Sequence, residues 1–502
     1  AQATGGVEPV LPLQAPDRRF AAPQWQAWPF SLWQQGFLMA QQWWQAATHG
    51  VPGVEKHHED LVAFAARQWL DLLSPGNLPW ANPVVIDRTV REAGANLARG
   101  LQFWADDLQR QASGAMPAGA EQFRSGHEVA LTPGKVVLRN RLIELIQYAP
   151  ATPTVHAEPL LIVPAWIMKY YILDLSPHDS LIKFLVGQGH TVFCISWKNP
   201  GQAERDLGMD DYLQLGLRDA LDAVGRICPK RKVHAVGYCL GGTLLAIGAA
   251  AMARDGDTRL TSTTYFAAQT DFSEPGELSL FIDASQLNLL AAQMHETGYL
   301  TAQQMAGAFS MLRSYDLLWS RMVNEYLLGE RAPMNDLMAW NADATRMPAK
   351  MHTQYLERLF LRDDLSEGRY LVDGKPVSLG SLKLPTFMVG TLTDHVAPWR
   401  SVHKLHHLSP AEISFVLTSG GHNAGIVNPP APDSRRSYQL LTRPAGGQYL
   451  GPDDWLAAAP RHQGSWWPAW QQWLAARSAG KVKPPRMGHA LAEAPGRYVL
   501  EK

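Results

Sequence analysis

Apolar residues near the start of the chain recur at the spacing of helices. In residues 61–73 (LVAFAARQWLDLL) and 91–110 (REAGANLARGLQFWADDLQR) they return every three or four positions, which places them on one face of a helix. The break between these stretches, SPGNLPWANP, contains Pro, Gly and Asn, which are typical turn residues. We therefore predict that residues 26–112 are helical and belong to an all-α N-terminal domain over residues 1–120.

The pattern changes near residue 120 to that of strands. Residues 127–140 and 142–150 are predicted as antiparallel strands, because apolar and β-branched residues surround turn signals there. From residue 158 onward, short apolar segments alternate with helical ones, which indicates a parallel sheet covered by helices on both faces. The predicted strands of this part are PLLIVPAW, HTVFCISW, KVHAVGY and STTYFAA.

A helical block rich in Met and Trp interrupts this alternation between about residues 271 and 382, as in SMLRSYDLLWSRMVNEYLLG. Two further strands, PTFMVGT and EISFVLTSG, then resume the sheet with the helix WRSVHKLHHL between them. We predict a catalytic domain over residues 121–502 of α/β class, interrupted by a cap insertion over residues 271–382.

Composition and charge exclude several classes of protein. The chain has 502 residues, 46% of them hydrophobic and 18% charged, as in a globular protein. Its net charge of -1 gives no basic field that would attract nucleic acid, so we expect no nucleic-acid partner. The three cysteines are too few for a disulfide framework and match no zinc spacing, which indicates a reducing cytoplasm and no metal.

One cysteine lies in a glycine-rich turn. The residues Gly237-Tyr238-Cys239-Leu240-Gly241 have the form G-x-C-x-G between a predicted strand and a predicted helix, the context of a nucleophile elbow in the α/β-hydrolase fold. The positive end of the helix dipole favours the thiolate at this position. The uncharged run from Ala235 to Ala253 is therefore interpreted as a buried helix and not as a membrane span. The alternative is a small core cysteine in a tight turn.

An elbow nucleophile requires an acid and a histidine later in the chain. Asp394 follows the predicted strand PTFMVG, and His422 follows EISFVLTSG, so both lie at carboxyl ends of parallel strands, where such sheets bind ligands. We predict a catalytic Cys239, Asp394 and His422 on an α/β-hydrolase fold. His395, next to Asp394, is a rival base.

The sequence also gives predictions for the oxyanion donors, three histidines and the other two cysteines. The expected oxyanion donors are the backbone N–H of Leu240 and one near Trp166, that of Ile167, in the loop after LLIVP. Three histidines resemble a metal site, but they lie on a predicted helix next to polar residues, so a solvated helix face is favoured; they are His403, His406 and His407. Cys194 is expected in the core, and Cys228 at the end of a helix. No cofactor is expected.

These residues occur in motifs that resemble the polyhydroxyalkanoate synthases, which polymerise 3-hydroxyacyl-CoA into storage polyester. The similarity runs from about residue 30 to the end. The motifs are GYCLGG, KYYILDLSP, GHTVFCISWKNP, WNADATRMPAKMH, TDHVAPW, GHNAGIVNPP, GSWWPAW and APGRYVLEK. The resemblance places the catalytic residues of that family on Cys239, Asp394 and His422. Three positions depart from the motifs of that family. Met168 stands where Asn is usual, and Asn335 stands where Phe is frequent. Asn423 stands where an apolar residue is common.

The resemblance is closest to class I, the single-subunit enzymes that favour short-chain monomers. It implies (R)-3-hydroxyacyl-CoA as substrate, 3-hydroxybutyryl-CoA first, and the growing polyester chain as a second partner. It also implies a homodimer, granule-associated proteins as further partners, and a cytoplasmic location on polyester granules.

Thioester substrates suit a cysteine nucleophile, because exchange between thioesters conserves the activation that polymerisation needs. His422 can deprotonate the thiol and then a 3-hydroxyl, while Asp394 either orients His422 or assists the hydroxyl directly. A thioesterase or another hydrolase of this fold is the competing interpretation. A granule-coat protein without catalytic activity is the second.

The N-terminal helices carry an aromatic pattern of their own. Trp33, Phe37 and Trp44 recur at spacings that suggest one apolar helix face. This face either packs on the chain's own catalytic domain or lies on the polyester granule or a dimer partner.

Overall fold

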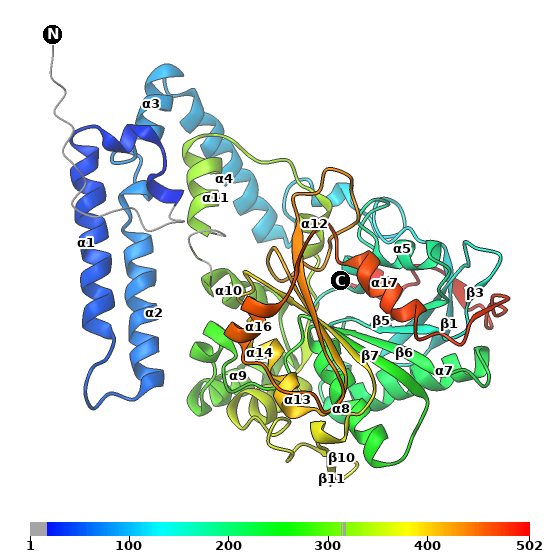
Figure 1. Cartoon of the computed structure of the whole chain (residues 1–502). Coiled ribbons are helices and arrows are strands. Elements are labelled where there is room, and N and C mark those ends of the chain that lie inside the picture. Colours follow the sequence, from blue (N-terminus) through cyan, green and yellow to red (C-terminus); the bar gives the residue numbers. More distant parts are fainter. Residues whose placement is uncertain (1–17, 313, 315–317) are drawn as a thin grey trace. The chain divides into compact units, whose positions relative to one another are not determined.

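A mixed β-sheet forms the centre of the larger part of the chain (Figure 1). The computed structural model describes residues 18–312, 314 and 318–502, so the first 17 residues of the expected N-terminal domain lie outside the described part. Among the described residues the sheet has the strand order β15-β14-β13-β12-β7-β6-β4-β5-β2-β1-β17. Its six central strands, from β13 to β5, are parallel, and the strands at both edges are antiparallel.

The strands confirm the predicted alternation and the α/β class. Each predicted parallel strand is present and almost fully buried, as expected for strands covered on both faces. The sheet consists of β1 (Gly134–Arg139), β2 (Ile143–Tyr148), β4 (Leu160–Val163), β5 (Val192–Trp197), β6 (Val233–Tyr238), β7 (Leu260–Phe266), β12 (Thr386–Thr391), β13 (Ile413–Thr418), β14 (Ser437–Arg443), β15 (Arg461–Gln463) and β17 (Ala492–Glu493).

Helices connect the parallel strands. The helix α8 (Leu240–Arg254) follows β6, and its residues from Leu240 to Met252 are all buried, so the uncharged run is a core helix, as predicted. No helix in the described ranges is long and apolar enough to cross a membrane. The other α-helices of this part are α5 (Leu181–Gly187), α6 (Met209–Asp211), α7 (Asp219–Ile227), α14 (Trp399–His403), α15 (Leu405–Leu408), α16 (Pro452–Ala458) and α17 (Trp467–Ala475).

The predicted insertion lies between β7 and β12. It contains α9 (Ala284–Thr297), α10 (Ala302–Leu312), α11 (Ser320–Met322), α12 (Asp336–Ala342) and α13 (Ala349–Tyr355), with the short strands β8 (Tyr299–Leu300), β9 (Met347–Pro348), β10 (Leu371–Val372) and β11 (Lys375–Pro376). The chain divides into two compact units: residues 1–119 with 305–334, and residues 120–304 with 335–502. Part of the sequence expected in the cap insertion therefore packs with the N-terminal helices.

The smaller unit is helical in the described residues. Before residue 120 its α-helices are α1 (Phe30–Thr48), α2 (Lys56–Leu72), α3 (Pro83–Arg91) and α4 (Ala95–Ser113), and α11 belongs to it as well. The aromatic pattern of α1 is divided between core and surface: Phe37 is buried with Phe20 and Trp25, whereas Trp33 and Trp44 are about two-fifths exposed. The apolar positions therefore do not form one uniformly buried face.

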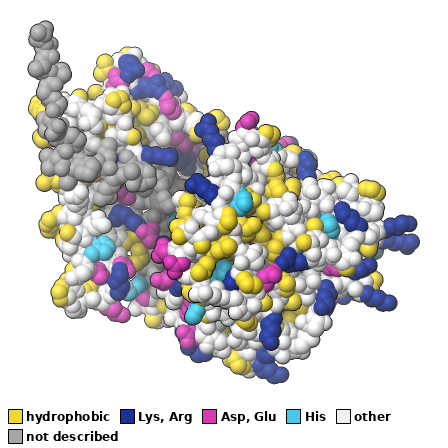
Figure 2. All heavy atoms as spheres, viewed as in Figure 1, with side chains coloured by type: hydrophobic (Ala, Val, Ile, Leu, Met, Phe, Trp, Pro, Cys, Tyr) yellow, Lys and Arg dark blue, Asp and Glu magenta, His cyan; other side chains and the backbone are white. Residues whose placement is uncertain are grey.

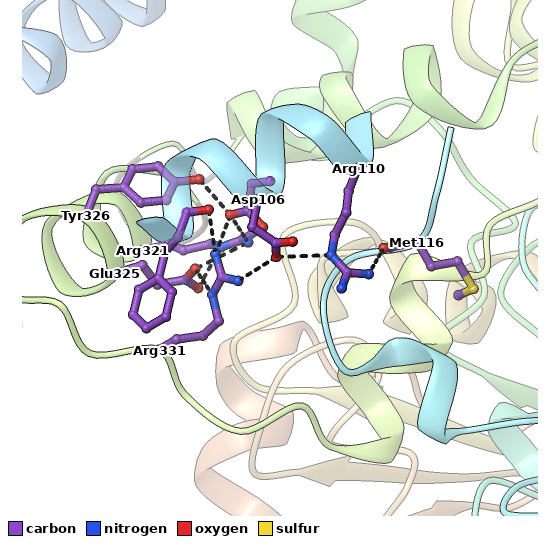
Figure 3. Close-up of polar contacts among 9 residues, drawn as sticks. Asp106, Arg110, Met116, Arg321, Glu325, Tyr326 and Arg331 are labelled. Carbon is purple, nitrogen blue, oxygen red and sulfur yellow. Dashed lines mark hydrogen bonds and ion pairs between the residues drawn. The ribbon is translucent and has the colours of Figure 1, made fainter. Parts of the chain in front are cut away.

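A network of ion pairs joins α4 to residues 321–331 within this unit (Figure 3). Arg331 donates to Asp107 at 2.6 Å and to Glu325 at 2.8 Å, and the Tyr326 hydroxyl also donates to Asp107 at 2.8 Å. The two segments approach closely because α4 has a glycine there: a Cβ at Gly100 would overlap the Tyr326 carbonyl. A segment more than 200 residues away in sequence thus completes the N-terminal helical unit.

Candidate active site

Cys239 occupies the turn between β6 and α8, the position predicted for a nucleophile. Its φ of 52° lies in the left-handed region, which costs a non-glycine residue backbone energy and is typical of nucleophile elbows. The Cys239 N–H donates to the Phe266 carbonyl at 2.9 Å and holds the turn against β7. A Cβ at Gly237 would overlap Gly242, and one at Gly241 would overlap the Val163 carbonyl, so the turn requires its glycines.

Cys239 is also the most accessible of the three thiols. It is partly exposed, whereas Cys194 and Cys228 are buried. Burial raises the pKa of Cys228 to about 12 and that of Cys194 well above its usual value. The predictions of a core Cys194 and of Cys228 at the end of α7 are confirmed.

Asp394 follows β12 and is held by four hydrogen bonds. Its Oδ1 accepts the N–H groups of Val396 and Ala397, both at 2.8 Å, and its Oδ2 accepts the Thr391 hydroxyl at 2.9 Å and lies 2.8 Å from His422 Nδ1. The side chain is 0% exposed. Burial alone would raise the pKa of Asp394, but His422 and the two N–H groups outweigh it and lower that pKa below its usual value. Asp394 is therefore a buried carboxylate.

His422 follows β13 and lies between Asp394 and Cys239. Burial alone would lower its pKa, but the Asp394 carboxylate and the Cys239 thiol raise it well above the usual value. The structure thus brings the three predicted side chains together, and Asp394 pairs with His422 while the rival His395 is its half-buried neighbour in sequence.

The two predicted oxyanion donors lie at neighbouring strand ends. Leu240 begins α8 directly after Cys239, and Ile167 lies in the loop after β4. Because β4 and β6 are parallel neighbours with Val163 opposite Gly237, both loops leave the same edge of the sheet. The Thr345 hydroxyl donates to the Trp166 carbonyl at 2.5 Å, so in the trans peptide the Ile167 N–H points the opposite way.

The predicted solvated helix face is wrong for His403 and His406, whereas His407 is exposed as predicted. His403 and His406 are 0% and 3% exposed and stack with ring centroids 4.2 Å apart, next to Phe415 and Trp455. Burial lowers the pKa of His403 to about 4 and that of His406 to about 3. The helical polarity pattern could not show that this segment packs into aromatic core. No group of three potential metal ligands occurs in the described ranges.

Two tryptophans of the GSWWPAW motif fix the loop that carries His422, a role that the sequence did not indicate. The Trp466 Nε1–H donates to the Gly425 carbonyl and the Trp467 Nε1–H to the Ile426 carbonyl, both at 3.0 Å. Both indoles are buried, as is usual for tryptophans whose N–H groups find acceptors. The start of α17 therefore holds the loop through hydrogen bonds to its backbone.

Other site residues were also missed. Thr391 is an ordinary strand former, and only its position three residues before Asp394 hints at its hydrogen bond. Tyr355, at the end of α13, lies near enough that burial and the Cys239 charge raise its pKa well above the usual value. The three departures from the motifs have structural places. The Asn335 side chain accepts the Met338 N–H as the N-cap of α12, and Met168 forms an isolated antiparallel β-bridge with Ala344. The Asn423 side chain accepts a hydrogen bond from the Tyr238 hydroxyl.

Known proteins resemble this chain over nearly its whole length. Residues 16–185 match the family model described as the poly-beta-hydroxybutyrate polymerase N-terminus, and residues 158–429 match the alpha/beta hydrolase fold. The poly(3-hydroxyalkanoate) polymerase of Methylorubrum extorquens is 41% identical over 504 residues, covering 99% of this chain and 82% of that protein. The poly(3-hydroxyalkanoate) polymerase subunit PhaC of Cupriavidus necator is 35% identical, covering 100% and 86%. A monoacylglycerol lipase structure from Paleococcus ferrophilus has 12% identity and a TM-score of 0.38, covering 67% and 99%.

Proposed function

The chain belongs to the poly(3-hydroxyalkanoate) polymerase family, and from this premise we propose that Cys239, His422 and Asp394 form its catalytic triad. The protein is an acyltransferase that joins 3-hydroxyacyl units into polyester. The observation that carries the triad is the 2.8 Å contact between His422 Nδ1 and Asp394 Oδ2, on an imidazole whose pKa is also raised by Cys239. We further propose 3-hydroxybutyryl-CoA and other short-chain (R)-3-hydroxyacyl-CoA thioesters as substrates.

The first half of the cycle loads Cys239. His422 takes the proton from Cys239 Sγ, and the thiolate attacks the thioester carbonyl of the substrate. The bond between the carbonyl carbon and the CoA sulfur breaks, and the CoA thiolate leaves with the proton from His422. The backbone N–H groups of Leu240 and Ile167 are the proposed donors to the oxyanion of this step.

The second half forms the ester. A 3-hydroxyl loses its proton to His422 and attacks the acyl group on Cys239, which is released as a thiolate and takes up that proton. The alternative in which Asp394 deprotonates the hydroxyl has little support, because both Asp394 oxygens already accept two hydrogen bonds and its side chain has no exposed surface. Asp394 orients His422 and stabilises its charged form.

The surroundings of Cys239 favour an alcohol over water as the second nucleophile. Tyr355, from the cap insertion, is near enough for the Cys239 charge to affect its pKa, and it belongs to an aromatic cluster with Phe272 and Phe360. Apolar walls of this kind suit a hydrophobic acyl chain and exclude water. The alternative is a thioesterase of the same fold, which would release the free acid in place of polyester.

Partners and location extend the same proposal. We propose that the enzyme works as a homodimer in the cytoplasm on polyester granules, together with granule-associated proteins. The exposed tryptophans of the N-terminal unit support a polyester contact, because Trp28, Trp43 and Trp69 are 81%, 63% and 65% exposed. The charge distribution does not indicate a strongly charged partner on the face in view. Figure 2 shows acidic and basic side chains spread over that face, with neither sign covering it.

The decisive experiment supplies purified full-length protein with 3-hydroxybutyryl-CoA. We expect CoA release together with insoluble polyester, abolished by C239A and reduced at least about 100-fold by D394N or H422Q. The matched control is C228A, which removes a buried thiol outside the site and leaves the rate unchanged. CoA release with only free 3-hydroxybutyrate identifies a thioesterase, and polymer formation by C239A refutes the triad.

A further inference from the structure

Two residues that flank the proposed nucleophile and base are bonded to each other. Tyr238 precedes Cys239 at the end of β6, and Asn423 follows His422 in the loop after β13. The Tyr238 hydroxyl donates to Asn423 Oδ1 at 2.7 Å. Since β7 and β12 separate β6 from β13 in the sheet, this bond joins the end of β6 to a loop that strand pairing does not hold beside it.

Burial and ring packing also restrict the Tyr238 side chain. It is 2% exposed, and a phenol buried to that degree requires a hydrogen-bond partner. Its ring lies against the His422 imidazole, with centroids 5.7 Å apart and planes inclined at 31°. The orientation of the proposed base is therefore restricted by Asp394 through its Nδ1 and by the Tyr238 ring.

Asn423 also reaches the cap insertion. Its Nδ2 donates to Asn341 Oδ1 of α12 at 3.4 Å. Immediately around Asn341, the chain is bonded to the loop after β4: the Trp340 Nε1–H donates to the Lys169 carbonyl at 2.7 Å, and the Thr345 hydroxyl donates to that of Trp166. The amide of Asn423 thus links the His422 loop to the segment that fixes the proposed oxyanion loop.

We propose that Tyr238 and Asn423 are positioning residues whose hydrogen bond holds His422 against Cys239, and that Asn341 couples this pair to α12. The inference rests on the proposed triad and extends it to residues that touch neither thioester nor hydroxyl. It gives a structural role to the departure at position 423, where an apolar residue is common in the related motifs. Here the neighbouring buried phenol requires an acceptor, which an apolar side chain cannot supply.

The test uses the full chain and the variants N423L, Y238F and their double variant. Leucine has a shape similar to that of asparagine but accepts no hydrogen bond, and Y238F retains the buried ring. We expect each single variant to lower the rate of Cys239 alkylation by iodoacetamide between pH 6 and 7 about tenfold, because a displaced His422 no longer stabilises the thiolate. The kcat for 3-hydroxybutyryl-CoA falls similarly, while KM stays within about twofold.

The double variant separates a shared bond from two independent effects. Because removal of both partners leaves no unpaired group, we expect it to lose no more than either single variant. Alkylation reports on Cys239, since Cys194 and Cys228 are buried, and C239A supplies the background rate. The matched control is Y265F: Tyr265 of β7 is equally buried, but its hydroxyl makes no hydrogen bond to Asn423 or any other residue proposed for the site.

Four results bear against the inference or its premise. An unchanged alkylation profile in N423L overturns the positioning role, as does full additivity in the double variant. A lower Tm with an unchanged profile assigns the bond to folding alone and likewise overturns it. If the parent protein lacks alkylation that depends on Cys239, the proposed triad itself fails, and the two failures are thereby distinguished.

Discussion

At the scale of single residues, the charge of Asp394 is the property that its surroundings most clearly control. A fully buried carboxylate is stable only when its lone pairs are satisfied, and here two backbone N–H groups, the Thr391 hydroxyl and His422 satisfy them. Burial raises the pKa of Asp394, but His422 and the two N–H groups lower it by more. All four contacts together leave no oxygen facing a substrate hydroxyl. A single arrangement therefore fixes both the charge of Asp394 and its orienting role.

Thr391 is the side chain that tests this account. T391V removes the hydroxyl bonded to Asp394 Oδ2 but keeps the β-branched shape. We expect kcat to fall about tenfold, and the acid limb of the kcat/KM profile to move to higher pH, because loss of a donor raises the pKa of Asp394.

The parallel register supplies the control for this prediction. Thr418 is paired with Thr391 across β12 and β13 and is equally buried, but it does not bond Asp394. T418V is expected to keep kcat within about twofold of the parent. Equal losses in T391V and T418V would contradict the role assigned to Thr391.

At the scale of elements, strand ends are what the sequence predicts best. Alternation of apolar strands and helices locates the ends of β6, β12 and β13, and parallel strands bring those ends to one edge, so the residues that follow them meet. Thr391 could not be identified in this way, because threonine is common in strands for reasons of packing alone. Packing between distant segments, such as residues 305–334 with α4, leaves no local pattern at all.

Mutation of Arg331 tests whether the ion-pair network of the N-terminal unit stabilises the packing of residues 305–334 on α4. Arg331 is mostly buried and bonds Asp107 and Glu325, both also largely buried. R331L leaves these carboxylates without that partner, so we expect the unit to lose about 2–3 kcal/mol of stability. Hydrogen exchange of residues 320–331 and limited proteolysis within residues 305–334 measure the effect.

An exposed pair on the same unit provides the comparison. Arg91 and Asp87 form an i,i+4 pair on the surface of α3, for which a contribution of about 0.3–0.5 kcal/mol is typical. R91L should therefore leave the exchange and cleavage of residues 305–334 unchanged. If R331L behaves like R91L, the network does not hold this segment on α4.

At the scale of the whole molecule, buried neutral histidines govern the response to acid. Burial lowers the pKa of six histidines from the ordinary 6.5: to about 3 in His190 and His406, to about 4 in His234, His352 and His403, and in the same direction in His156. Below pH 6.5 the unfolded chain binds protons at these positions while the folded chain does not, so stability falls with pH. His422 has the opposite sign, since its raised pKa adds stability that is present below 6.5 and lost as pH rises through the raised pKa.

Six histidines with a lowered pKa outweigh the one with a raised pKa, so we expect the Tm to fall continuously from pH 7.5 to pH 5. His352 isolates the cause, because burial is the sole reason for its lowered pKa. In H352L one proton fewer binds on unfolding, so the Tm of this variant should fall less steeply with acid, whatever its value at pH 7.5. Differential scanning calorimetry at three pH values in one ionic strength measures both slopes. A Tm independent of pH, or parallel slopes for the two proteins, would mean that these histidines take up protons without unfolding.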